Sequence, residues 1–285
     1  MSILIRKKTA LRAILIILLI TIFLFSPFCA FIRSCAVMLP YSCYHKRNSV
    51  LYKNQIKFSI SGGLHTKKRD WYPFTVYFND DEGLSAYLGE PVEFTVLYNF
   101  GHFQHLKGAS SYYNPNSPYY SSIYGGYILK PYDKNRKFGF QEDGTLNLEE
   151  LAKIPEFDQK YLLLTSIGCP PEDKVFHVEI ISTEYDLEYA GYKGWARVDL
   201  EIRTNSPVHE YRGFNQGYLQ FGKPMGLFHY KESFPVIDLK GRAYARYFDE
   251  FQSTIVLYVM APSREVVNEA DQEILSDTEI NKIIN

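Results

Sequence analysis

The sequence predicts a mainly β fold: an antiparallel, β-sandwich-like domain with a few short helices and a C-terminal helix, preceded by one N-terminal transmembrane or signal helix. Turn-forming residues recur at short spacing, β-branched and aromatic runs separate them, and one long apolar run lies near the N-terminus. These observations divide the chain into a basic segment (1–12), an apolar helix (13–32), a linker (33–52) and an extracytoplasmic β-rich domain (53–285).

The apolar run from Ala13 to Ile32 is long enough to cross a membrane. Twenty residues rise about 30 Å as a helix, which matches the hydrocarbon core of a bilayer. Four basic residues precede the run, and this bias predicts a single-pass protein of the cell membrane with its N-terminus in the cytoplasm and its main domain outside. The alternative is a signal peptide cleaved near Ala36, which would leave a secreted protein.

Charge is distributed unevenly along the chain. Of the 31 basic and 32 acidic residues, seven basic and no acidic ones precede residue 48, so the remainder carries 24 basic against 32 acidic residues. Its net charge is therefore −8. Binding to nucleic acid requires a concentrated basic surface that neutralises phosphates. The composition of the exported part thus argues against nucleic acid as a partner.

Several segments show the alternation typical of β-strands. In residues 195–203 apolar positions alternate with charged ones: Ala196, Val198, Leu200 and Ile202 against Arg197, Asp199, Glu201 and Arg203. We expect this strand to have one buried and one solvated face, as in antiparallel sheets. Residues 56–60 and 93–98 also alternate, whereas 255–260 is apolar throughout and is expected to be a central strand covered on both sides.

Two helices are expected within the β-rich domain. Asn147 is a suitable N-cap with Glu150 three residues later, so a helix should begin here and be limited by Pro155. The second helix runs from Ser263 to about Leu275, with a shorter helical turn toward Ile284. Its apolar face should pack against the domain and is formed by Val266, Val267, Ala270 and Ile274.

Residues 110–127 contain six tyrosines among serine, asparagine, proline and glycine. Tyrosine offers a rigid face and a hydroxyl at low entropic cost, and with small polar residues it forms adaptable recognition surfaces. Tyr124 and Tyr127 are expected to lie in a strand. The other four are candidate binding residues for a glycan, a cell-wall polymer or another protein: Tyr112, Tyr113, Tyr119 and Tyr120. The alternative for these four is a structural role in cross-strand pairs.

Motifs for metal binding are incomplete. Residues 143–150 match only the second half of a calcium-binding EF-hand loop, because Gly139 stands where the first acidic ligand belongs. The acidic run at 79–82 and the pair His102 and His105 lack further ligands at metal-binding spacing. We therefore expect no metal and no cofactor.

Catalytic motifs are equally sparse. Cys169 is followed closely by Glu172 and Asp173, which disfavour a reactive thiolate, although it can pair with Cys43 in an oxidising compartment. A pair of catalytic carboxylates can come from anywhere in the chain, so an exported hydrolase, for example one acting on glycans, stays open. The sequence favours a membrane-anchored or exported non-catalytic binding protein. The alternatives are that hydrolase and an architectural component of the cell envelope.

We expect the intact chain to remain in the membrane fraction after a high-salt wash, because burial in lipid rather than charge holds an apolar helix. Immunoblots of membrane and soluble fractions measure this distribution. Finding only a shortened, soluble form would instead indicate cleavage near Ala36.

Overall fold

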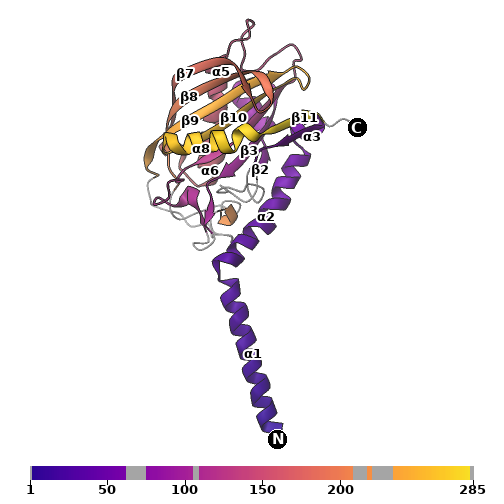
Figure 1. Cartoon of the computed structure of the whole chain (residues 1–285), viewed down its shortest axis with the longest axis vertical. Helices are drawn as coiled ribbons and strands as arrows, with labels where there is room; N and C mark the ends of the chain where they lie inside the picture. The colour runs from indigo at the N-terminus through magenta and orange to yellow at the C-terminus, as the bar shows by residue number, and fades with distance from the viewer. Residues whose placement is uncertain (1, 62–74, 105–108, 208–216, 220–233, 283–285) are drawn as a thin grey trace.

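The computed structural model describes residues 2–61, 75–104, 109–207, 217–219 and 234–282. Among them, seven antiparallel strands form the main sheet (Figure 1). In spatial order these are β2 (Val76–Asn79), β3 (Val92–Phe100), β6 (Ile123–Pro131), β10 (Ser253–Ala261), β9 (Val236–Phe248), β8 (Tyr192–Asn205) and β7 (Phe176–Tyr189). Two-stranded sheets are formed by β1 (Ile56–Ser59) with β11 (Glu279–Lys282) and by β4 (Phe103–Gln104) with β5 (Ala109–Ser110). The predicted mainly β, antiparallel fold is confirmed.

The centre of the main sheet is buried on both faces. One face packs against α4 (Asp81–Leu88), α5 (Leu148–Phe157) and the segments that follow α5, η3 (Asp158–Leu163) and α6 (Leu164–Ser166). We call this the α5 face. The opposite face, the α8 face, is covered by α8 (Arg264–Glu273), α3 (Val50–Lys53) and the β1–β11 sheet. Every residue of β10 is buried, which confirms the central strand predicted at 255–260.

The alternation in β8 agrees with the prediction over most of residues 195–203, and Asp199 departs from it most clearly. Ala196, Val198 and Ile202 are buried in the core of the α5 face, and Glu201 is exposed on the other side. Asp199 was expected to be solvated but is only 9% exposed. The reason is that Arg264 of α8 reaches its carboxylate, with Nη1 at 2.9 Å from Oδ1.

The helix α8 follows its predicted pattern. Ser263 is its N-cap and accepts a hydrogen bond from the Val266 amide at 3.4 Å, and the predicted apolar face is buried. The helical turn expected toward Ile284 is wrong as far as Lys282. A 3₁₀ turn (Leu275–Asp277) leads into β11, where Ile280 is buried opposite Phe58 of β1.

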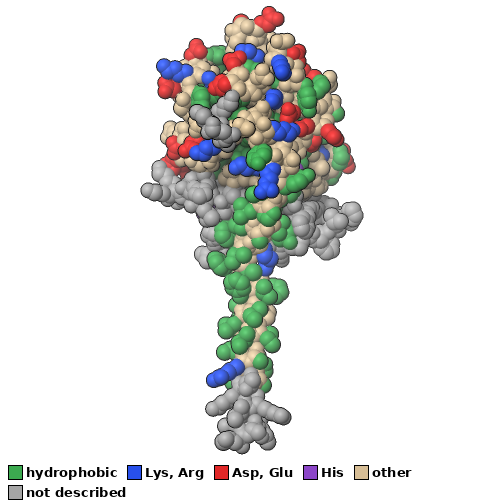
Figure 2. All heavy atoms as spheres, turned by 90° about the vertical axis from the view of Figure 1, so that its right-hand side faces the viewer, with side chains coloured by type: hydrophobic (Ala, Val, Ile, Leu, Met, Phe, Trp, Pro, Cys, Tyr) green, Lys and Arg blue, Asp and Glu red, His purple; other side chains and the backbone are tan. Residues whose placement is uncertain are grey.

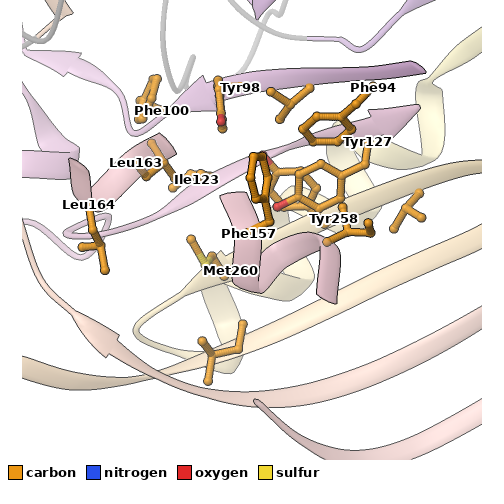
Figure 3. Close-up of a cluster of buried hydrophobic side chains, with 14 of the residues drawn as sticks. Phe94, Tyr98, Phe100, Ile123, Tyr127, Phe157, Leu163, Leu164, Tyr258 and Met260 are labelled. Atoms are coloured by element: carbon orange, nitrogen blue, oxygen red, sulfur yellow. The ribbon is translucent and has the colours of Figure 1, made fainter. Parts of the chain in front are cut away.

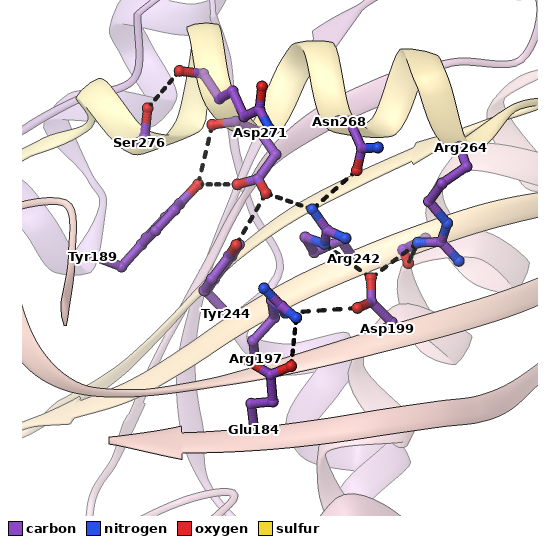
Figure 4. A network of polar contacts seen from close by, with 12 residues as sticks. Glu184, Tyr189, Arg197, Asp199, Arg242, Tyr244, Arg264, Asn268, Asp271 and Ser276 are labelled. Atoms are coloured by element: carbon purple, nitrogen blue, oxygen red, sulfur yellow. Dashed lines mark hydrogen bonds and ion pairs between the residues drawn. The ribbon is translucent and has the colours of Figure 1, made fainter. Parts of the chain in front are cut away.

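A network of ion pairs and hydrogen bonds fastens α8 to the sheet (Figure 4). Arg242 of β9 binds Asp199 of β8 at 2.8 Å and Asp271 of α8 at 2.7 Å. Asp271 also accepts hydrogen bonds from Tyr189 at 2.6 Å and Tyr244 at 3.0 Å. The side chains of Arg242, Asp199 and Asp271 are 12%, 12% and 7% exposed. Their mutual pairing offsets the cost of removing these charges from water.

The N-terminal apolar run is divided between two helices. α1 (Ser2–Leu24) ends before Ile32, and α2 (Pro27–Arg47) follows after a bend of 63°. Pro27 causes the break, because proline disfavours α-helical geometry in the residue before it, and Ser26 is extended at φ −74° and ψ 151°. Within the described residues no single helix is sufficiently long and apolar to span a bilayer, whereas the bent pair passes by length and composition.

The segment predicted as a linker, residues 33–52, is instead mostly helical and partly packed on the domain. Met38 is 1% exposed and belongs to the core of the α5 face. The hydroxyl of Ser42 donates to the carbonyl of Thr75 and accepts from the amide of Tyr77, both at 3.0 Å. The prediction failed because the polar residues of this segment read as a linker, whereas tertiary contacts to β2 stabilise the helix.

Replacing Asp271 with alanine should destabilise the fold by about 3 kcal/mol, because the Arg242 charge loses one of its buried partners. Urea unfolding of the purified full chain, followed by circular dichroism, measures the change. Glu201→Ala is the matched control, since it removes an exposed ion pair to Lys240 of β9 and should cost at most about 1 kcal/mol. Equal effects of the two substitutions would show that the network does not hold α8.

Candidate functional site

An apolar cavity of about 120 Å³ lies between α5 and the sheet. Leu148, Leu151 and Pro155 of α5 form one wall, and strands β7 to β10 form the other. The cavity exists because short side chains occupy β9 on this face. Ala243 stands in register between Val198 of β8 and the much larger Tyr258 of β10, and its methyl group leaves the space between them unfilled.

The cavity reaches the surface at the β7 edge of the sheet. Phe176, Val178 and Ile180 alternate along β7 and line it. Val178 lies opposite Ile202 of β8, so both project from the α5 face. Ile180 is 41% exposed although it contributes to the cavity wall. A continuous apolar path therefore leads from solvent into the interior.

A buried carboxyl group lies beside this cavity. Asp158 is 0% exposed and accepts hydrogen bonds from the hydroxyls of Tyr98 and Tyr127, the latter at 2.7 Å. Burial raises the pKa of Asp158 to about 7, and the two tyrosine hydrogen bonds oppose this rise. Tyr127 links the carboxyl to the cavity, because its ring is one of the lining groups.

The two tyrosines that bind the carboxyl, Tyr98 and Tyr127, belong to the buried aromatic cluster shown in Figure 3. Tyr258 stacks on Tyr127 with ring centroids 4.5 Å apart and donates a hydrogen bond to the carbonyl of Leu97 at 3.2 Å. Gly125 of β6 permits this reach, since a Cβ there would lie 1.8 Å from the Leu97 oxygen and 3.1 Å from the Tyr258 hydroxyl. Any other residue at position 125 would therefore overlap the Leu97 carbonyl that accepts this hydrogen bond.

The helix α5 positions the polar residues of the site. Its predicted cap is confirmed, with the Asn147 side chain accepting from the Glu150 amide at 3.2 Å. Pro155 does not end the helix as expected. The chain continues through Phe157 into the π-helical segment η3, whose wider turn buries Asp158 and Gln159 in succession. Such segments are rare and often occur at functional sites.

Sequence reasoning did not single out Asp158 or Gln159. A signal was present, because Asp158 stands four residues after Ile154 on the buried face of the helix, where an apolar residue is expected. A polar residue on an apolar stripe indicates either a buried hydrogen-bond network or a site. Because we expected the helix to be limited by Pro155, Asp158 was not assigned to its buried face.

The four candidate tyrosines do not form an exposed surface. Tyr112, Tyr113 and Tyr119 are 5%, 3% and 6% exposed, and Tyr120 is partly buried with its hydroxyl bonded to the carbonyl of Pro207 at 3.0 Å. None of the four lines the cavity. Their role in binding stays a prediction, without the flat exposed face on which it was based. Tyr124 and Tyr127 lie in β6, as predicted.

The acidic motifs serve as caps and turns. Glu150 accepts from the Gly139 amide at 2.6 Å and pairs with Arg136, so it is not placed as a calcium ligand. Asp80 caps α4 by accepting from the Gly83 amide at 2.8 Å. In the part of the chain that the structure describes, no group of three histidine, cysteine or acidic side chains could hold a metal ion. His105 lies outside the described residues.

The cysteines are free. Cys43 is exposed on α2 and Cys169 is buried after α6, so the disulfide considered from the sequence is not formed. Burial raises the pKa of the Cys169 thiol to about 11, and the charge of Asp173 adds to this effect. As predicted, its surroundings disfavour the reactive thiolate.

Comparison of the chain with protein-family models, with curated proteins and with solved structures found no match. The cavity and the polar residues beside it are therefore the basis for proposing a function. The wall of the cavity is almost entirely apolar, which suits binding of an apolar group rather than a charged one.

Asp158 should make the protein less stable as the pH rises. Its pKa is about 7 in the folded chain against a usual 3.8, so between these values the folded state holds a proton that the unfolded state releases. Its stabilising contribution is complete below pH 3.8 and is lost as the pH rises to about 7, by at most about 1.4 kcal/mol per pH unit.

Urea unfolding of wild type and Asp158→Asn at several pH values between 5 and 8 measures this loss. The difference in unfolding free energy between them should change between pH 5 and 7 and become constant above that range. Asp186→Asn alters an exposed carboxyl and should show no such trend. A difference between wild type and Asp158→Asn that does not vary with pH would contradict the assignment.

Proposed function

We propose that the chain is a membrane-tethered, non-catalytic binding protein whose β-rich domain takes an apolar chain into the cavity between α5 and the sheet. The observation that carries this proposal is an apolar, partly open cavity of about 120 Å³ beside the buried core of the α5 face. Engineered apolar cavities of about 150 Å³ bind benzene, so the space is sufficient for a short hydrocarbon segment.

Exposure of α1 supports the tether. Its apolar side chains surround the helix and lie outside the domain (Figure 2). Ile14, Ile17 and Leu19 are 62%, 63% and 57% exposed. A contiguous apolar surface of this kind is rare in soluble monomers and is typical of membrane or protein contacts. We therefore propose a single-pass arrangement with the N-terminus in the cytoplasm and the domain outside.

The position of α2 favours an uncut anchor over a secreted form. Cleavage near Ala36 would divide α2 two residues before Met38, which is buried in the core of the α5 face. The shortened chain would begin within a packed helix. An intact α2 connects the tether directly to the domain, whereas the secreted alternative needs this helix to begin part-way along its length.

The other functional classes have less support. A hydrolase acting through paired carboxylates requires two acids facing a cleft, whereas no acidic side chain lines the described cavity. An architectural component predicts no small-ligand site. In our proposal the β1–β11 sheet gives the domain its sandwich-like character, because Phe58 and Ile280 pack against the α8 face of the main sheet. The opposite face of the main sheet holds the ligand.

Filling the cavity should weaken binding. The intact chain in lipid vesicles is exposed to a photoreactive alkyl alcohol, and labelled peptides are mapped by mass spectrometry. Wild type should be labelled in α5 and β7. Ala243→Leu should reduce this labelling by about tenfold, because a ligand and a larger side chain compete for the same space. Labelling of α1 from the bilayer serves as an internal reference.

Ser182→Leu is the matched control. It adds the same bulk to β7 at an exposed position outside the cavity, so labelling of α5 and β7 should be unchanged. Absence of label from both segments in wild type would refute the proposed function.

A further inference from the structure

Gln159 is a polar residue in the apolar cavity wall, and its side chain forms no hydrogen bond within the described part of the chain. Its side chain is 97% buried, being only 3% exposed, and it contributes to the lining. Among the described residues nothing donates to or accepts from its amide group. The Gln159 amide is not among the side-chain groups that are sealed off without a partner, so it is reached from the cavity that it lines. An amide with free donors and a free acceptor, beside a space that a ligand can enter, points to a hydrogen-bond partner supplied by the ligand.

The other polar groups of the lining already have partners. The Tyr127 hydroxyl donates to Asp158, and the Tyr258 hydroxyl donates to Leu97. The guanidinium of Arg242 lies in the network on the α8 face, where it binds Asp199 and Asp271. Gln159 is therefore the lining residue, in the described part of the chain, that can offer both a donor and an acceptor to a bound molecule.

Charge in this region selects against an anionic ligand. The described lining offers no uncommitted cation to pair with a carboxylate or phosphate. Asp158 precedes Gln159 directly, and its carboxyl is linked through Tyr127 to the cavity wall. In a site of low dielectric constant, an unpaired anion is strongly disfavoured by desolvation, and it would also repel the Asp158 carboxylate at any pH at which that group is ionised.

We propose that Gln159 determines the specificity of the cavity, and that the ligand is an uncharged alkyl or acyl chain whose hydroxyl or carbonyl end hydrogen-bonds to the Gln159 amide. This inference rests on the proposed function. The enclosed space holds the polar end and about four to six carbons, by comparison with cavities that bind benzene. The rest of the chain leaves over Val178 and Ile180 at the β7 edge.

Photoreactive alkyl probes of equal length test this inference on the intact chain in lipid vesicles. The probes end in a hydroxyl, a methyl ester, a methyl group or a carboxylate. Wild type should label α5 and β7 about tenfold more with the hydroxyl and ester probes than with the methyl or carboxylate probes, because only the first two gain a hydrogen bond to the amide without burying a charge; tenfold corresponds to about 1.4 kcal/mol. This comparison requires no substituted protein.

Gln159→Leu should remove the preference. The variant keeps a side chain of similar size but has no hydrogen-bonding group, so labelling by the methyl probe should equal or exceed labelling by the hydroxyl probe. Gln141→Leu makes the same change at an exposed position outside the lining and should retain the wild-type preference. Thermal unfolding of each variant at one pH confirms that the domain remains folded.

The outcomes separate this inference from the function on which it rests. Equal labelling of α5 and β7 by all four probes in wild type, with Ala243→Leu reducing it about tenfold, would leave the binding function intact and overturn the role of Gln159. A wild-type preference for the carboxylate probe would overturn it as well. If no probe labels these segments in wild type, the proposed function itself fails.

Discussion

Burial of the main sheet on both faces is the constraint on which the rest of the structure depends. Every residue of β10 is buried, and its neighbour β6 carries large side chains toward both sides. Such a sheet is stable only when separate elements cover each face. α5 and its continuation cover one face, whereas α8, α3 and the β1–β11 sheet cover the other. The positions of these covering elements determine where the domain is filled and where it is hollow.

Buried polar side chains are paired differently on the two faces of the main sheet. On the α8 face Arg242, Asp199 and Asp271 bind one another and neighbouring tyrosines, so buried charges meet opposite charges and hydrogen-bond donors. On the α5 face the described residues give Asp158 two tyrosine hydrogen bonds and no cation, and they give the Gln159 side chain no hydrogen bond. The first arrangement locks a helix in place. The second leaves hydrogen-bonding capacity beside an apolar cavity, which is the chemistry of a binding site.

Proline interrupts helical geometry at two places, one at the candidate site and one near the N-terminus. Pro155 lacks an amide hydrogen, so the α-helical hydrogen-bond pattern of α5 is interrupted there. The following π-helical segment directs Asp158 toward Tyr98 and Tyr127 and leaves Gln159 at the cavity. At the other end of the chain Pro27 has a comparable effect, because it divides the apolar run and allows α2 to pack on β2 while α1 extends away from the domain (Figure 1).

Local patterns in the sequence were sufficient to predict the strands and helix caps that depend on interactions between neighbouring residues. The alternation at 195–203, the apolar run at 255–260 and the caps at Asn147 and Ser263 each describe interactions within a few residues. Tertiary structure alone decided the burial of the candidate tyrosines, the pairing of Asp199 with α8 and the cavity itself. Tyr98 and Asp158, for example, meet across 60 residues of chain. The periodicity of side chains determines which face of an element is apolar, but whether that face is filled or hollow depends on the sizes of side chains from distant segments that come together only in the folded protein.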